Sequence, residues 1–257
     1  MGLRFGRSDS RTSLRASRLE SAYQRVHHSL RMQQDFVADV SHELRTPLTT
    51  VSGNLALLRL DPPLPAEEQA DILSDLVDES ERLIRLVNDL LVLARADSQR
   101  SLVYEPVMVA GVIAESVRQV QQLDRTREFT ISAAEDLCLA GDRDAFKQVL
   151  LILLDNAVKH SKGRIFVNAA PGGRVVVVTV QDEGPGIPAD VLEHIFDRFY
   201  RASEDAAVPG YGLGLSIAKA LVEAQSGSIL IESAVGIGST VSVEMPSCQT
   251  AKVFPEK

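Results

Sequence analysis

The chain has 257 residues, of which 45% are hydrophobic, and it carries a net charge of −8. This length and apolar content allow a sizeable core in one or two domains. The acidic balance argues against binding of a nucleic-acid backbone as the main activity, and the lack of Trp argues against a base-stacking surface. We therefore expect no nucleic-acid partner.

Cysteine usage and hydropathy indicate the compartment. Cys138 and Cys248 lie far apart and form neither a metal-ligand spacing nor a disulfide framework, so we expect buried or incidental thiols in a reducing compartment. We find no signal peptide and no apolar run near the ~18 residues of a membrane span, which favours a cytoplasmic location. An arginine-rich start fits either a position just inside a membrane, below a sensor segment absent from this chain, or a solvated, partly disordered end.

The first third of the chain is predicted to be helical. Apolar spacing predicts a leading helix from about Leu14 to Asp35. A coiled-coil-like stripe follows within 34–60, and a second stripe predicts another helix from about Ala66 to Asp97. The prolines of Asp61-Pro62-Pro63-Leu64-Pro65 separate the two helices. The first stripe comprises Phe36, Val40, Leu44, Leu48, Val51, Leu55 and Leu58, and the second comprises Ile72, Leu73, Leu76, Leu83, Leu86, Val87, Leu90 and Leu93.

A lone helical hairpin cannot cover both stripes, so we expect two chains to form a homodimeric four-helix bundle. After a linker at 96–101, shorter strands and helices alternate, which predicts an α/β sandwich. The expected strands are 102–107, 128–132, 164–169, 175–181, 228–233 and 240–245, with a hairpin through Pro171-Gly172-Gly173. The expected longer helices are 110–123, 143–159 and 213–225.

His42 is the first candidate for chemistry. It lies two residues from both Val40 and Leu44, which is about 200° of helical rotation, so it faces away from the apolar stripe and into solvent. An exposed imidazole is mostly neutral at pH 7 and keeps a lone pair for attack on phosphorus. Glu43 could accept or orient its other proton, and Thr46 lies one turn away on the same face. A zinc-protease motif would need a second His at Thr46, and we treat His27, His28 and His194 as solvated surface residues.

The run SHELRTPL around His42 resembles the phosphoacceptor box of sensor histidine kinases. The resemblance implies that His42 is phosphorylated and that Glu43 assists. It also implies that Thr46 helps to position a water that dephosphorylates a partner response regulator.

Four patches downstream are spaced as a nucleotide site requires. The first ends a helix at Asn156 and Lys159, which offer a hard oxygen for Mg²⁺ and a cation for phosphate. The second follows a strand at Asp182, whose carboxylate can accept from an amino group of adenine. The third is the aromatic run from Ile195 to Arg201, and the fourth is a glycine loop opening a helix, which favours phosphate.

In this order the patches resemble the asparagine, first glycine, phenylalanine and second glycine boxes of the histidine-kinase ATPase domain, a fold shared with gyrase, Hsp90 and MutL. The resemblance covers about Leu30 to Pro246. It implies that Asn156 binds Mg²⁺, that Asp182 reads adenine with Thr240 near the base, and that Lys159 and Arg201 approach the phosphates. The other implied nucleotide-binding residues are His160, Gly184, Gly186, Phe199, Gly210, Gly212, Leu213 and Gly214.

Two departures from the family pattern concern the asparagine box. Ile152 stands where many members have a further Asn, and His160 stands where they have Tyr. Both could tune the affinity for ATP, and His160 could replace the Tyr as a polar contact to the nucleotide. Residues 202–209 are expected to form a lid over ATP that is mobile without nucleotide.

The resemblance implies a Mg²⁺- and ATP-dependent protein histidine kinase that passes its phosphoryl group to an aspartate of a response regulator and also acts as its phosphatase. The expected divisions are a signalling helix or linker at 1–30, a dimerisation and phosphotransfer domain at 31–98, a catalytic ATP-binding domain at 99–248 and a tail at 249–257. The alternatives are a non-kinase ATPase of the same fold and an inactive dimeric scaffold. The stimulus, the cognate regulator and the choice between cis and trans phosphorylation stay open.

Overall fold

The computed structural model of the chain describes residues 9–98, 102–201 and 210–248. The chain divides into two compact units, Met1–Leu83 and Ile84–Lys257, which are described here one at a time. Within the described ranges, none of the helices combines the length and the apolar content needed to cross a membrane. The domain limits expected at 30/31, 98/99 and 248/249 stay predictions.

Two long helices occupy the first part of the chain. The leading helix and the phosphoacceptor helix expected from the sequence form one continuous helix, α1 (Asp9–Leu57), which contains Pro47. The second helix is α2 (Ala66–Ser98), with Glu67 and Glu68 in its first turn and Arg95 in its last, where these charges complement the helix dipole. Its start is fixed by Gln69, whose backbone N–H donates to Pro65 O at 3.0 Å and whose Nε2 donates to Leu64 O at 2.7 Å.

The apolar stripes of these helices are only partly covered. On α1, Leu48 is 52% exposed and Leu55 is 49% exposed. On α2, the exposed apolar side chains recur at spacings of three, four and seven, which places them on one face of the helix. They are Leu73 and Val87 of the predicted stripe, and Val77, Ile84 and Leu91, which lie outside it. Leu86 and Leu93 of the predicted stripe are buried instead. An uncovered stripe of this period is what the expected four-helix bundle requires.

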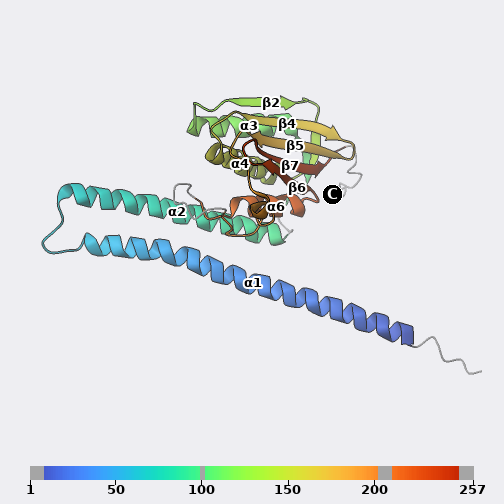
Figure 1. Cartoon of the computed structure of the whole chain (residues 1–257), viewed down its shortest axis with the longest axis horizontal. Coiled ribbons are helices and arrows are strands. Elements are labelled where there is room, and N and C mark those ends of the chain that lie inside the picture. The colour runs from blue at the N-terminus through green and yellow to red at the C-terminus, as the bar shows by residue number, and fades with distance from the viewer. Residues whose placement is uncertain (1–8, 99–101, 202–209, 249–257) are drawn as a thin grey trace, which may run out of the picture. The chain divides into compact units, whose positions relative to one another are not determined.

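The second unit contains an α/β sandwich, as expected. Its five-stranded sheet has the order β2-β4-β5-β7-β6, which Figure 1 shows side by side; β2 runs parallel to β4, and the other pairs are antiparallel. The strands are β2 (Phe129–Ala133), β4 (Ile165–Gly172), β5 (Val175–Asp182), β6 (Ser228–Ala234) and β7 (Gly238–Pro246). The hairpin predicted through Pro171-Gly172-Gly173 is confirmed, and since Gly172 pairs with Val175, its two turn residues are Gly173 and Arg174.

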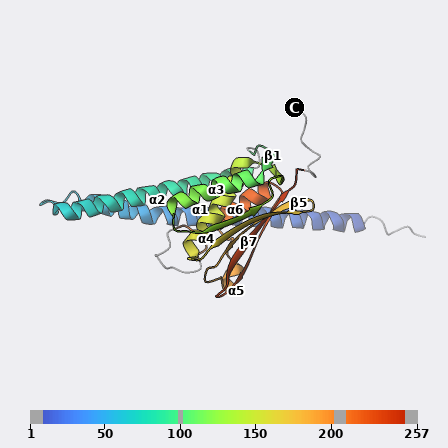
Figure 2. The same ribbon diagram turned by 90° about the horizontal axis from the view of Figure 1, so that it is seen from above.

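Helices cover one face of this sheet. They are α3 (Val109–Leu123), α4 (Arg143–His160) and α6 (Gly214–Ala224), and Figure 2 shows them together on one side; the short helix α5 is Ala189–Leu192. Alternate residues of β5, such as Val176, Val178 and Val180, are buried toward the helices. Phe146 and Leu150 of α4 are buried in the same core, so the apolar face predicted for this helix is confirmed.

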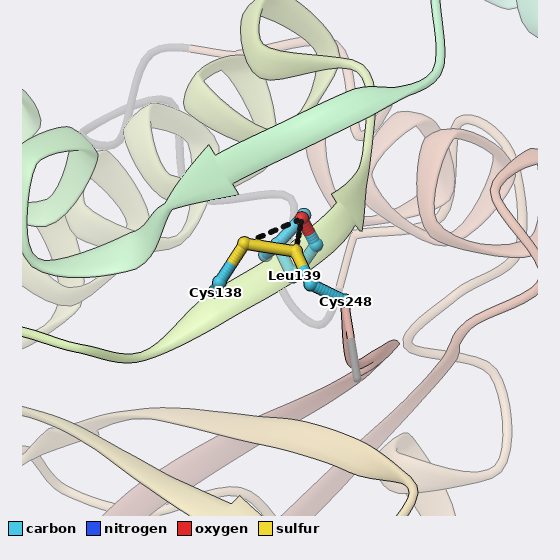
Figure 3. Close-up of a disulfide and its surroundings, with 3 residues drawn as sticks. All are labelled: Cys138, Leu139 and Cys248. Carbon is cyan, nitrogen blue, oxygen red and sulfur yellow. Dashed lines mark hydrogen bonds between the residues drawn. A yellow bond between two sulfur atoms is a disulfide. The ribbon is translucent and has the colours of Figure 1, made fainter. Parts of the chain in front are cut away.

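The sequence reading missed the strand β3 (Cys138–Gly141), which pairs antiparallel with β1 (Glu105–Met108). Leu139 of β3 also forms an isolated bridge with Ser247, just after β7. These pairings bring Cys138 and Cys248 to a Cα–Cα distance of 5.5 Å, and their sulfur atoms are joined as a disulfide (Figure 3). The expectation of two separate thiols is therefore wrong, because the missed strand places residues 110 positions apart in sequence side by side.

Candidate functional site

The His42 region lies on one face of α1. His42 and Thr46 are both exposed, Glu43 is half-buried and Pro47 is buried, so the solvent-facing position predicted for His42 is confirmed. Pro47 has no N–H to donate to the carbonyl of Glu43, one turn earlier. Thr46 O accepts from Thr50 Oγ1 at 3.3 Å, within the same helix. The histidine and the threonine are thus presented to solvent one turn apart by a single helix.

Asp182 ends β5, where its carboxylate accepts a hydrogen bond from the backbone. Gly184 N–H donates to Asp182 Oδ1 at 2.8 Å, and Ser239 lies opposite Asp182 on the neighbouring strand β7. Burial raises the pKa of Asp182, while the backbone of Gly184 and Ser239 and the nearby His160 act in the opposite direction. A Cβ atom on Gly184 would lie 2.6 Å from Asp182 Oδ1, so this residue has no room for a side chain.

The loop after Asp182 is fixed to the turn between β6 and β7. Gly186 has a φ of 72°, and a Cβ atom there would lie 2.1 Å from the carbonyl oxygen of Ala234. Gly236 N–H donates to Pro185 O at 2.7 Å, and Ile187 N–H donates to Ser233 Oγ at 2.8 Å. The first glycine box therefore depends on close packing against the end of β6 and the turn that follows it.

Strand register separates Thr240 from Asp182. Asp182 pairs with Ser239, whereas Thr240 pairs with the preceding residue, Gln181. Because successive side chains of a strand point to opposite faces, Ser239 shares the face of Asp182 and Thr240 faces the other way. Sequence reasoning missed Ser239, although period-two counting back from Val241 and Val243 could have identified it.

The end of α4 brings the asparagine box next to the Asp182 loop. Asn156 is half-buried, and a Cβ atom on Gly184 would lie only 2.9 Å from His160 O. Desolvation, followed by the nearby charge of Lys159, lowers the pKa of His160. Lys159 Nζ lies 2.6 Å from Asp155 Oδ2, so its ammonium group has an ion-pair partner one turn away.

Both ends of α4 are anchored by side chains. At the start, Asp142 Oδ1 accepts from Ala145 N–H at 2.9 Å and caps the helix. At the end, Arg127 donates from Nη2 to Val158 O at 3.1 Å and from Nη1 to Gly163 O at 3.2 Å. The Arg127 guanidinium therefore ties the last turn of α4 to the turn that precedes β4.

The phenylalanine box and the second glycine box are packed together. Phe199 has a φ of 62°, uncommon for a residue with a side chain. A Cβ atom on Gly212, whose φ is 69°, would lie 2.5 Å from Tyr200 O. Leu213 is buried and precedes Gly214 at the start of α6, where a Cβ atom would be 3.4 Å from Ile152 Cγ2 of α4.

The remaining predicted residues are less closely tied to this centre. Gly210 and Arg201 are exposed on either side of residues 202–209, and the expected lid lies outside the described residues. His194 is exposed as expected, and its Nδ1 is 2.8 Å from Asp197 Oδ2. Leu213, the N-cap of α6, makes no side-chain hydrogen bond to the first turn, and the backbone N–H groups at a helix N-terminus favour an anion.

The His42 region and the Asp182 region each match a known protein family. Residues 32–99 match the family described as His Kinase A (phospho-acceptor) domain, and residues 141–249 match the family described as histidine kinase-, DNA gyrase B-, and HSP90-like ATPase. The two matches contain His42 and Asp182, respectively.

Relatives and a solved structure agree with these matches. The chain is 36% identical over 223 residues to the signal transduction histidine-protein kinase/phosphatase MprB of Mycolicibacterium smegmatis, covering 80% of this chain and 43% of the relative. It is 29% identical over 241 residues to the sensor histidine kinase YclK of Bacillus subtilis, covering 91% and 51%. The histidine kinase AdeS of Acinetobacter baumannii has the same fold, with a TM-score of 0.66, 24% identity and coverage of 80% of this chain and 98% of that one. The chain thus spans about half the length of the curated relatives.

Proposed function

Because the chain belongs to the sensor histidine kinase family, we propose that it transfers the γ-phosphate of ATP to its own His42 and then to an aspartate of a response regulator. The ATPase-family domain supports the use of ATP. The observation that carries the proposal is that His42 is solvent-exposed on α1, within the phospho-acceptor match, in a chain that also carries this ATPase domain.

His42 is the nucleophile of the proposed reaction. One ring nitrogen attacks the γ-phosphorus in line with the departing oxygen of ADP, and Glu43 takes or orients the proton on the other nitrogen. The exposure of His42 supports this role, since the ATP-binding domain must reach the ring. Thr46, exposed one turn later, would orient the water that removes phosphate from the regulator.

The nucleotide would bind at the Asp182 end of the sheet. Asp182 would accept from the amino group of adenine, and the N-terminus of α6, with Gly212 and Gly214, would hold the phosphates. Lys159 and Arg201 would add positive charge. The close packing of Gly186 and Gly212 against neighbouring carbonyl groups supports this assignment, because a Cβ at either position would displace the loop that forms the site.

Mg²⁺ fits the residues present. Its usual phosphate-bound form takes only one or two protein oxygens, with the rest of its shell from phosphates and water. The half-buried amide of Asn156 offers one such oxygen at the end of α4. The described residues contain no group of three acidic, histidine or cysteine side chains placed to hold a metal ion. When bound, Mg²⁺ would neutralise charge on the transferring phosphate.

We propose that two chains form the functional unit, because the exposed stripes of α1 and α2 require a partner of the same period. The response regulator would dock beside His42 and Thr46. Since ATP and such regulators are cytoplasmic, we place the chain in the cytoplasm, as the cytoplasmic part of a membrane sensor.

Incubation of the chain with γ-labelled ATP and Mg²⁺ tests the proposal. We expect a label that survives base but not acid, as a phosphoramidate does, and that disappears in His42→Gln. His27→Gln is the matched control, because His27 is an exposed histidine on the same helix. Asn156→Ala should also abolish labelling if this residue holds the metal.

Other results of the same assay point to the alternatives. ATP hydrolysis without any labelled protein would indicate a non-kinase ATPase. Neither labelling nor nucleotide binding would indicate an inactive scaffold. Label that persists in His42→Gln would contradict the assignment of the phosphoacceptor.

A further inference from the structure

The side chain of Ser233, in β6, has three polar partners. Its Oγ is 2.8 Å from Ile187 N, 2.8 Å from Gly238 O and 2.9 Å from Ser239 Oγ. The partners belong to the loop after Asp182, to the start of β7 and to the residue paired with Asp182. One hydroxyl group of β6 therefore connects the loop after Asp182 with the start of β7.

A hydroxyl group has one hydrogen to donate and two lone pairs to accept with. Gly238 O can only accept, so it takes the single hydrogen of Ser233. Ile187 N–H can only donate, so it occupies one lone pair. The remaining lone pair of Ser233 must then receive the hydroxyl hydrogen of Ser239.

This arrangement determines what Ser239 can offer to a ligand. With its hydrogen directed at Ser233, the Ser239 Oγ presents only lone pairs elsewhere. Ser239 is paired with Asp182 across β5 and β7, so the two side chains lie beside each other on the same face of the sheet. Asp182 and Ser239 together form a pair of acceptors with no hydroxyl hydrogen free to rotate toward the ligand.

We propose that Ser233 is a positioning residue for nucleotide selection: it holds Ser239 as an acceptor, so that the site favours 6-aminopurines over 6-oxopurines. An exocyclic amino group donates hydrogen bonds to both acceptors, whereas a 6-oxo group brings a third acceptor against them. The proposal rests on the proposed function in one respect, namely that the purine base binds at Asp182.

The test measures competitive displacement of a fluorescent ATP analogue from the full chain by ATP and by ITP, which carries a 6-oxo group. In Ser233→Ala the Ser239 hydroxyl can rotate and donate to that group, so the preference for ATP over ITP should fall about five- to tenfold. Ser233→Thr keeps the hydroxyl in a strand that suits a β-branched residue, and should keep the preference. Ser228→Ala is the matched control, because Ser228 lies on the same strand but donates to the surface residue Glu244.

If Ser233 had only a structural role, Ser233→Ala would weaken the binding of ATP and ITP alike, and the ratio of the two affinities would not change. The double-mutant cycle with Ser239→Ala separates the two accounts. Ser239→Ala alone should reduce the preference for ATP, and Ser233→Ala should then add no further loss. An unchanged ratio of affinities in Ser239→Ala, or an equal loss from Ser233→Ala in both backgrounds, overturns the inference.

The same measurements separate the inference from the proposed function. If the wild-type chain binds neither nucleotide, the proposed function itself fails. If the wild-type chain prefers ATP and Ser233→Ala keeps that preference, only the inference fails.

Discussion

The two regions proposed to carry the chemistry are built in different ways. The His42 region lies within one short stretch of α1, where a single helix presents His42 and Thr46, one turn apart, to solvent. The Asp182 region is assembled from the end of β5, the turn between β6 and β7, and the end of α4. The first depends on helical periodicity alone, whereas the second depends on strand register and on backbone segments that approach within van der Waals distance.

A single type of substitution, Gly to Ala, should distinguish the two regions most strongly. Gly186→Ala adds a Cβ atom 2.1 Å from Ala234 O at a φ of 72°, so we expect a loss of about 2–4 kcal/mol in the free energy of unfolding. Gly53→Ala adds a Cβ atom to open space on α1, where Ala favours the helix by about 0.5–1 kcal/mol. Denaturant unfolding of both variants measures the two effects.

Gly236→Ala is the control for backbone strain. Gly236 lies in the turn that contacts Gly186 and has a φ of 81°, but a Cβ atom there meets nothing within 4 Å. If Gly236→Ala destabilises the chain as much as Gly186→Ala, positive φ alone explains the loss and close packing does not.

Asp182→Asn should affect binding and stability in opposite directions. The amide retains one acceptor but loses the charge, so ATP should bind about 10–100-fold more weakly. Burial raises the pKa of Asp182 in the folded chain above its unfolded value. Folding therefore favours the neutral carboxyl over the charged one. This contribution to stability is fully present below the unfolded pKa and is lost as pH rises through the folded pKa.

The nucleotide-free Asp182→Asn chain should accordingly unfold at a higher temperature than the wild type at pH 7. Near pH 4 and below the difference should narrow, because the wild-type carboxyl becomes neutral in both states. Thermal unfolding monitored by circular dichroism at both pH values checks this. A variant less stable than the wild type at pH 7 would show that the backbone of Gly184 and Ser239 outweighs burial.

Arg127→Met should produce a smaller effect, confined to the nucleotide region. Without the hydrogen bonds to Val158 O and Gly163 O, the end of α4 loses its tie to the turn before β4, and ATP should bind about tenfold more weakly. Arg143→Met is the control, since Arg143 pairs with Glu115 at the opposite end of α4. Equal losses in the two variants would indicate general destabilisation of the helix.

Much of the fold could be read from the sequence because its signals are local. The stripes of α1 and α2, the exposed position of His42 and the β4–β5 hairpin follow from periodicity and turn residues. The strand β3 was missed because its four residues are too few for a period to emerge. The Cys138–Cys248 disulfide was missed with it, since only the pairing of that strand brings the two residues together.

The site residues show the same limit. The sequence motifs placed Asp182 and the glycines, but they could not show which residue of Ser239-Thr240 shares the face of Asp182. A shift of one residue along a strand moves a side chain to the other face, and only the register decides this. The hydrogen-bond partners of Ser233 depend on three strand and loop segments at once, so they lie beyond any local pattern.

The smallest predicted effect concerns the difference between Ser239, which pairs with Asp182, and the next residue, Thr240. Thr240→Ala should change the affinity for ATP less than twofold, because Thr240 faces away from Asp182, whereas Ser239→Ala should weaken binding about fivefold. Titration of each variant with a fluorescent ATP analogue compares them directly. A larger loss in Thr240→Ala than in Ser239→Ala would show that the base contacts the opposite face of β7.

The central claim is that the exposed histidine of α1 receives the phosphate bound by the Asp182 region. Mass spectrometry of the full chain after incubation with ATP and Mg²⁺, with digestion at alkaline pH to preserve phosphohistidine, tests it most directly. The account predicts one added phosphoryl group, on the peptide that contains His42, and a lower yield of it in Asp182→Asn at ATP concentrations below the Kd of that variant. A phosphoryl group on another residue, or undiminished modification of His42 in that variant, would contradict it.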